Sequence, residues 1–171
     1  VLKEKMNANI KIKNLRKISG EIVGSVEIKS SRLKSINCPK ELIPFLIDEL
    51  PILFIISSLT KGVSKFKQIE ELSKKESNRI EESRKILMQA GIKCKTTKNS
   101  MTIYGSDKIN FKNKSIVVKT HGDHRICMSA VIFSLVTGIK VKINNFETVN
   151  TSFPDFVPLI RSLGGKVVKI K

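Results

Sequence analysis

Hydrophobic and polar positions divide the chain into helix-like and strand-like blocks, and one series of blocks occurs twice. An apolar stretch over 49–59 is typical of a buried helix, and the stretch over 63–66 that follows it is typical of a strand. The same order returns with an apolar helix over 124–135 and a strand over 139–143. The pattern therefore predicts an internal repeat.

The ends of both apolar helices carry residues that favour helix termini. Asp48 and Asp123 stand just before the helices, and Asp is a favoured N-cap because its carboxylate accepts hydrogen bonds from unpaired N–H groups. Gly62 and Gly138 follow the helices, and glycine readily adopts the left-handed conformation that often ends a helix. We therefore expect the two aspartates to cap equivalent helices.

Each copy continues with a second helix and further strands. The second helices are expected to end at Gly91 and at Gly164. Further strands are expected over 92–95, 100–104, 115–119 and 166–169. The strands over 100–104 and 115–119 would complete hairpins.

The opening residues resemble the end of an earlier copy, with Asn7 in the turn position that glycine occupies elsewhere. We therefore divide the chain into a partial repeat over 1–35, a repeat over 36–108 and a repeat over 109–171. Alternating helices and strands predict an α/β fold in which helices cover the sheets. Because the chain starts at Val1 without an initiator Met, we expect it to be part of a longer protein.

Composition favours one compact domain without a membrane partner. The chain has 171 residues, and 40% of them are hydrophobic. The longest apolar stretch, 42–59, contains prolines and acidic residues, whereas a membrane span needs about 20 mostly apolar residues. With no signal peptide visible, a cytoplasmic protein is expected. The cysteines are odd in number and widely spaced, which predicts reduced thiols at Cys38, Cys94 and Cys127.

The net charge of +17 favours anionic partners of any kind, including nucleic acid. Aromatic residues make up only 5% of the chain, Trp is absent, and the lysines are spread along the sequence. A basic nucleic-acid-binding module therefore stays an alternative whose support is the charge alone.

Charged side chains gather at one expected helix start. Ser73 and Glu76 have the spacing of a capping box, so the helix that runs to Ala90 is expected to begin there. Lys75 and Arg79 would then share a face of its first turn, where their charge opposes the helix dipole. An anionic ligand would explain such a pair, although Glu76 could be a cap alone.

A second helix start carries the same kind of residues. His124 and Arg125 follow the candidate cap Asp123, and the unpaired N–H groups of a helix start favour an anion. Asp48 and Asp123 could each be a helix cap and nothing more. The segment 151–154 supplies a further expected cap, with proline in the first turn of the last helix.

Six segments of the chain stand out together, which are Gly20–Gly24, Ser31–Lys34, Asp48–Pro51, Lys75–Arg79, Gly122–Arg125 and Ser152–Pro154. In their order and approximate spacing they resemble the 5-enolpyruvylshikimate-3-phosphate synthase family, and the resemblance covers essentially the whole chain. The resemblance implies a fold of two similar domains, each built from three repeated βαβαββ units with helices covering mixed sheets. The chain would be most of the C-terminal domain, with the N-terminal domain absent.

The resemblance implies transfer of the enolpyruvyl group of phosphoenolpyruvate to the 5-hydroxyl of shikimate 3-phosphate, with release of phosphate. Asp48 would be the base at that hydroxyl, and it would bind shikimate 3-phosphate together with Lys75. Glu76 would be the acid/base near the methylene carbon. The residues that would bind phosphoenolpyruvate are Lys75, Arg79, His124 and Arg125.

The family implies an enzyme that needs no cofactor and no metal and acts as a monomer completed by its N-terminal domain. His121 and His124 could suggest a metal pair, but a third ligand is not apparent. Asn78 stands where the family usually has Asp, and 151–152 is Thr-Ser where many members have a substrate-contacting Lys. The closest alternative, an enolpyruvyl transferase acting on UDP-N-acetylglucosamine, lacks the two charged motifs.

Overall fold

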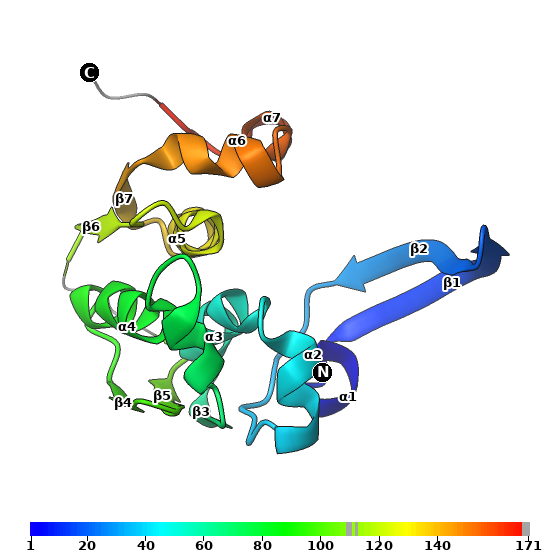
Figure 1. Cartoon of the computed structure of the whole chain (residues 1–171), viewed down its shortest axis with the longest axis horizontal. Coiled ribbons are helices and arrows are strands. Elements are labelled where there is room, and N and C mark those ends of the chain that lie inside the picture. Colours follow the sequence, from blue (N-terminus) through cyan, green and yellow to red (C-terminus); the bar gives the residue numbers. More distant parts are fainter. Residues whose placement is uncertain (109–110, 112, 169–171) are drawn as a thin grey trace.

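A computed structural model describes residues 1–108, 111 and 113–168 of the chain (Figure 1). Short helix α1 (Leu2–Lys5) leads into a long hairpin of β1 (Asn9–Ile18) and β2 (Glu21–Lys29) that extends from the body as an arm. The first complete series of elements follows as α2 (Ile43–Leu46), α3 (Leu50–Ser58), β3 (Gly62–Lys67), α4 (Arg79–Gln89), β4 (Cys94–Thr97) and β5 (Ser100–Gly105). The second series is β6 (Ser115–Lys119), α5 (His124–Thr137), β7 (Lys140–Asn144), α6 (Val149–Ser152) and α7 (Phe156–Ser162).

Three helices form the centre of the body, since α3, α4 and α5 all pack against one another. An antiparallel sheet of order β3-β5-β4 contacts α3 and α4. The strands β6 and β7 pair in parallel, and α4 and α5 contact them. The core between these layers includes Phe54, Phe66, Ile86, Met101 and Phe133. The expected α/β arrangement in which helices cover sheets is confirmed.

Several predicted elements are confirmed at their ends. Gly138 ends α5 in the left-handed conformation, with φ of 73°. Asn7 has φ of 62° in its turn after α1, and Gly91 and Gly164 have φ of 81° and 87° after α4 and α7. The strands expected over 63–66 and 139–143 are β3 and β7. Local signals therefore placed these ends correctly.

Other expectations are wrong in instructive ways. The strand β6 does not complete a hairpin, because it pairs in parallel with β7 across α5. The strand expected from residue 92 begins at Cys94, and no strand forms over 166–168; Lys169 lies outside the described residues. The segment 151–152 lies inside α6 instead of capping the last helix, whose N-cap is Asp155.

The start of α4 also differs from the prediction. Ser73 donates its hydroxyl hydrogen to the carbonyl of Glu70 inside a 3₁₀ helix, Glu70–Lys74, so the capping box does not form. The backbone is extended at Lys75, and the helix begins only at Arg79, where the Asn78 side chain accepts a hydrogen bond from the Glu81 N–H. Lys75 and Arg79 therefore do not share a helical turn.

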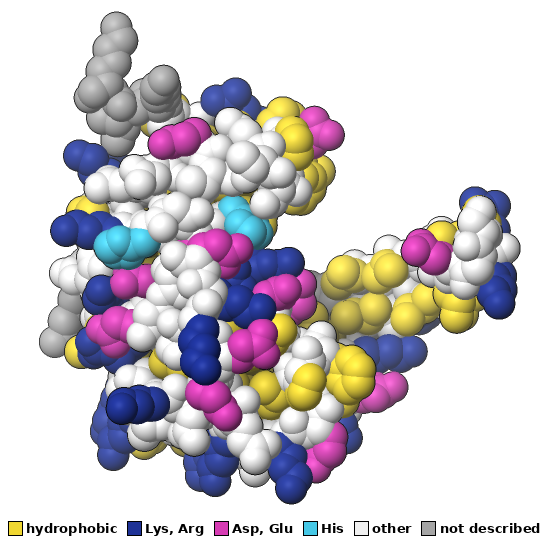
Figure 2. All heavy atoms as spheres, in the orientation of Figure 1, with side chains coloured by type: hydrophobic (Ala, Val, Ile, Leu, Met, Phe, Trp, Pro, Cys, Tyr) yellow, Lys and Arg dark blue, Asp and Glu magenta, His cyan; other side chains and the backbone are white. Residues whose placement is uncertain are grey.

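The arm formed by β1 and β2 has one apolar face. Ile12 lies opposite Val26 and Ile10 lies opposite Ile28, so these side chains share a face of the hairpin. Figure 2 shows hydrophobic side chains gathered along the arm, and Ile12, Val26 and Ile28 are exposed. None of the described helices is long and apolar enough to cross a membrane.

Candidate functional site

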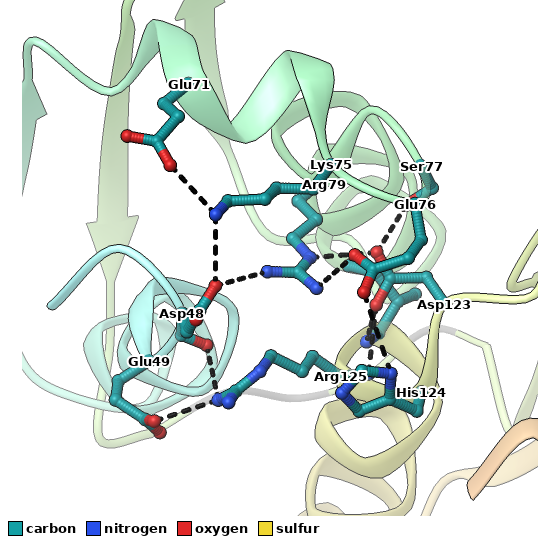
Figure 3. A network of polar contacts seen from close by, with 11 residues as sticks. Asp48, Glu49, Glu71, Lys75, Glu76, Ser77, Arg79, Asp123, His124 and Arg125 are labelled. Atoms are coloured by element: carbon teal, nitrogen blue, oxygen red, sulfur yellow. Dashed lines mark hydrogen bonds and ion pairs between the residues drawn. The ribbon is translucent and has the colours of Figure 1, made fainter. Parts of the chain in front are cut away.

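Three segments that are distant in sequence meet in one polar network (Figure 3). They are the turn that enters α3, the segment that runs from the 3₁₀ helix to the first residue of α4, and the start of α5. Packing of α3, α4 and α5 against one another brings their beginnings together. The network joins Asp48, Glu49, Glu71, Lys75, Glu76, Ser77, Arg79, Asp123, His124 and Arg125.

Arg79 lies at the centre, with only 1% of its side chain exposed. Its guanidinium donates to three different carboxylates. Nε lies 2.8 Å from Asp123 Oδ2, and Nη1 lies 2.9 Å from Asp48 Oδ1. Nη2 lies 2.6 Å from Glu76 Oε2. The two expected catalytic carboxylates are therefore held on one buried cation.

Asp123 is the buried anchor of the network, with no exposed surface. Its Oδ1 accepts hydrogen bonds from the N–H groups of Arg125 and Ile126, so the expected helix cap is confirmed. Its Oδ2 accepts from Ser77 Oγ at 2.9 Å and from Arg79 Nε. Burial acts to raise the pKa of Asp123, but Arg79 and the other donors outweigh it and hold that pKa below its usual range.

Asp48 does not cap α3, whose N-cap is Glu49 without a side-chain bond. Its side chain is 46% exposed and lies between two cations, with Lys75 Nζ 3.5 Å from its Oδ1. Partial burial acts to raise the pKa of Asp48, but the Arg79 hydrogen bond and the charges of Arg125 and Lys75 hold it below its usual range. An ionised and accessible carboxylate can accept a proton from a hydroxyl group.

The outer cations have carboxylate partners of their own. Lys75 Nζ lies 2.8 Å from Glu71 Oε1, and this hydrogen bond is the main reason that the pKa of Lys75 is raised. Arg125 Nη1 donates to the carbonyl oxygen of Asp48 at 2.9 Å and to Glu49 Oε1 at 2.8 Å. Both cations stay partly exposed, at 24% and 29% of their side chains.

Histidine positions bear on the metal alternative. His124 Nδ1 lies 4.0 Å from Glu76 Oε1 within the network, whereas His121 lies 3.7 Å from Glu82 beside α4. Within residues 1–108, 111 and 113–168, no group of three or more His, Cys, Asp or Glu side chains has an arrangement that could hold a metal ion. The thiols are buried or half-buried, and burial raises the pKa of Cys127 to about 12.

The network contains all six site residues named from the sequence: Asp48, Lys75, Glu76, Arg79, His124 and Arg125. Lys75, Arg79 and Arg125 lie together, but five carboxylates surround them, so anionic side chains outnumber these three cations. Sequence reasoning missed Glu49, Glu71 and Ser77. Of these partners, only Glu71 had a local signal, since it lies four residues before Lys75.

Comparisons with known proteins agree on one family. The family model described as EPSP synthase (3-phosphoshikimate 1-carboxyvinyltransferase) matches residues 1–160. The 3-phosphoshikimate 1-carboxyvinyltransferase of Ruthia magnifica is 39% identical over 159 residues, which cover 93% of this chain and 36% of that protein. The Clostridium tetani protein of the same name is 38% identical, covering 90% of this chain and 35% of that protein. The chain thus spans about a third of these relatives' length.

Solved structures give the same result. EPSP synthase from Acinetobacter baumannii is similar with a TM-score of 0.83 and 34% identity, covering 95% of this chain and 37% of that one. The enolpyruvyl transferase NikO from Streptomyces tendae shares only the fold, with a TM-score of 0.61 and 11% identity over 96% of this chain and 34% of that one. The chain belongs to the EPSP synthase family.

Proposed function

We propose that this chain supplies one side of a site that transfers the enolpyruvyl group of phosphoenolpyruvate to the 5-hydroxyl of shikimate 3-phosphate. Phosphate is the second product. Family membership supports the reaction, and one observation carries the site: Asp48 and Glu76 meet on the same buried Arg79. The chain is proposed to be most of a C-terminal domain of three repeats, the first one partial.

The addition step of the reaction needs two proton transfers that carboxylates can perform. A proton leaves the acceptor hydroxyl as its oxygen attacks the enol carbon, and another proton is delivered to the methylene carbon. Asp48 is suited to the first task because it is ionised and accessible. Glu76 is proposed for the second task, and it would remove a proton from the same carbon when phosphate leaves. Its side chain is 48% exposed, so a substrate can reach it.

The cations are proposed to bind the substrates. Lys75 would contact both substrates, while Arg125 and His124 would hold the phosphate and carboxylate of phosphoenolpyruvate. Each of the three guanidinium nitrogens of Arg79 already donates to a carboxylate, so Arg79 would bind phosphoenolpyruvate through the second N–H of Nη1 or Nη2, or by exchanging Asp48 or Glu76 for the substrate. Such an exchange would release a carboxylate for proton transfer.

The chain spans only about a third of its relatives' length, and the remaining part of those proteins bears on this proposal. Five carboxylates around three cations leave too little positive charge to hold two phosphorylated substrates. We propose that the N-terminal domain supplies further cations and completes the site, so that the chain alone is inert. Release of phosphate from phosphoenolpyruvate in the presence of shikimate 3-phosphate should stay at background for the chain alone and rise when an N-terminal domain is added. Turnover by the chain alone would contradict this.

Glu76→Gln separates a catalytic role from a structural one. Gln keeps a hydrogen-bond acceptor for Arg79 but cannot exchange a proton, so turnover of the completed enzyme should fall by about 10²–10⁴-fold with little change in stability. A lower melting temperature with near wild-type turnover would assign Glu76 to structure alone. Ser73→Ala, which lies outside the network, is the matched control.

The alternatives are less well supported. UDP-N-acetylglucosamine as acceptor would give phosphate release where shikimate 3-phosphate gives none, which a parallel assay measures. Nucleic-acid binding has only the net charge of +17 behind it and would appear as salt-dependent binding of a duplex. We propose a monomer that works in the cytoplasm without cofactor or metal, as the family resemblance implies.

A further inference from the structure

Two cations of the network rest on carboxylates that the proposed chemistry does not use. Lys75 contacts Glu71, and Arg125 contacts Glu49, both at 2.8 Å. The proposed proton transfers involve other groups, so these two glutamates need a separate explanation. In Figure 3 they lie on either side of Asp48, at the outer ends of the network.

Exposure distinguishes these glutamates from the anchor of the network. Their side chains are 60% and 57% exposed, whereas Asp123 is fully buried. An exposed ion pair is weak because water screens its charges, and either partner can leave into solvent. Asp123 cannot leave without stranding the buried charge of Arg79, which would be costly. Glu71 and Glu49 are thus displaceable, and Asp123 is fixed.

We propose that Glu49 and Glu71 are placeholders that occupy Arg125 and Lys75 until an anionic group of the substrate displaces them. The inference rests on the proposed function for the kind of anion, which is a phosphate or carboxylate group. Phosphate oxygens form charge-assisted hydrogen bonds with both cations, and arginine can bind them in two-point fashion. Each displaced glutamate returns to water.

This arrangement determines which ligands bind well. A small anion that reaches one cation competes with the charge of the glutamate paired to it and gains contacts at that cation alone, so its net gain is small. A ligand with several anionic groups can displace both glutamates and gain contacts at Lys75 and Arg125 together. The placeholders therefore lower affinity for inorganic phosphate and favour ligands that carry more than one anionic group.

Titration of the 171-residue chain with inorganic phosphate, followed by amide and arginine N–H chemical shifts, tests the first placeholder. Glu71→Gln should lower the dissociation constant for phosphate by about two- to fivefold, which is the change in affinity that corresponds to the free energy of one exposed ion pair. Glu70→Gln is the matched control, because it removes the same charge from the exposed neighbouring position. In a Lys75→Met background, Glu71→Gln should have no more effect than the control.

Glu49→Gln tests the second placeholder, with Glu41→Gln as its control, and should give a gain of about two- to fivefold. The double variant should combine both gains and narrow the preference for phosphoenolpyruvate over inorganic phosphate. The proposal would be overturned if the Gln variants bound phosphate no more tightly than their controls. It would also be overturned if even the double variant showed no phosphate binding. A completed enzyme without enolpyruvyl transfer would instead refute the proposed function and leave the placeholder result intact.

Discussion

The starts of α3 and α5 present the same sequence pattern, an aspartate before an apolar helix, yet the two aspartates behave differently. Asp123 is buried and caps α5, whereas Asp48 is 46% exposed and caps nothing. Repetition of a sequence pattern has therefore preserved the helix while the role of the aspartate has changed.

The backbone before each helix explains the difference. At α5, His121 and Gly122 have φ of 51° and 82°, and Asp123 follows in the extended conformation that suits an N-cap. At α3, the chain comes directly from α2, and the N-cap Glu49 has helical φ and ψ of −94° and −6°. Pro51 lies in the first turn of α3 and has no N–H to satisfy. Asp48 is thus available for another role.

The largest expected effect concerns activity at the start of α3. In the completed enzyme, Asp48→Asn should lower turnover by about 10²–10⁴-fold, because the amide cannot accept the proton of the hydroxyl group. Steady-state phosphate release measures this, and binding of phosphoenolpyruvate should change less than turnover. Urea unfolding supplies the control, since Asn can still accept the hydrogen bond from Arg79 and the half-exposed position should lose little stability. Full turnover in this variant would remove Asp48 from the mechanism.

The second prediction concerns stability at the start of α5. Asp123→Ala leaves Arg79 buried without its anchor and removes the cap of α5, so the free energy of unfolding should fall by about 3–5 kcal/mol. Urea denaturation of the wild type, Asp123→Ala and Asp48→Ala measures the free energy of unfolding lost at each of the two helix starts. Equal losses in the two variants would show that the burial of Asp123 does not distinguish it.

The third prediction is a smaller effect, on the pH dependence of stability. The pKa of Asp123 is lowered in the folded protein, so its stabilising contribution is complete above the unfolded pKa of about 3.9. That contribution is lost as the pH falls through the lower folded pKa. Urea midpoints measured from pH 6 downward should therefore fall less steeply for Asp123→Asn than for the wild type. Parallel curves would contradict the lowered pKa.

The smallest effect is expected at a third helix start. Asn78→Ala removes the side chain that caps α4, and the free energy of unfolding should fall by about 1 kcal/mol. Ser73→Ala should change stability by less than that, because this residue lies in the preceding 3₁₀ helix. Thermal unfolding of both variants shows which of the two side chains stabilises the start of α4. A larger loss at Ser73 would support the capping box that the structure lacks.

The sequence by itself determined most helix and strand positions, the cap at Asp123 and the stop at Gly138. These features follow from signals within a few residues, such as hydrophobic period, a capping carboxylate and a glycine with positive φ. The charged motifs also identified the six candidate site residues through the family resemblance. Their positions along the chain could be predicted without knowing how the helices pack.

Only the tertiary structure decided what those residues contact. Arg79 bonds to Asp48, 31 residues away, and to Asp123, 44 residues away, and no local pattern specifies such partners. The parallel pairing of β6 with β7 likewise depends on α5, which connects the two strands in the chain and packs against β7. Burial on the packed helices made Asp123 a fixed anchor, while the turn from α2 left Asp48 exposed. Burial and distant partners arise only when α3, α4 and α5 come together, which is why the same residue type could be a cap at the start of α5 and a candidate base at the start of α3.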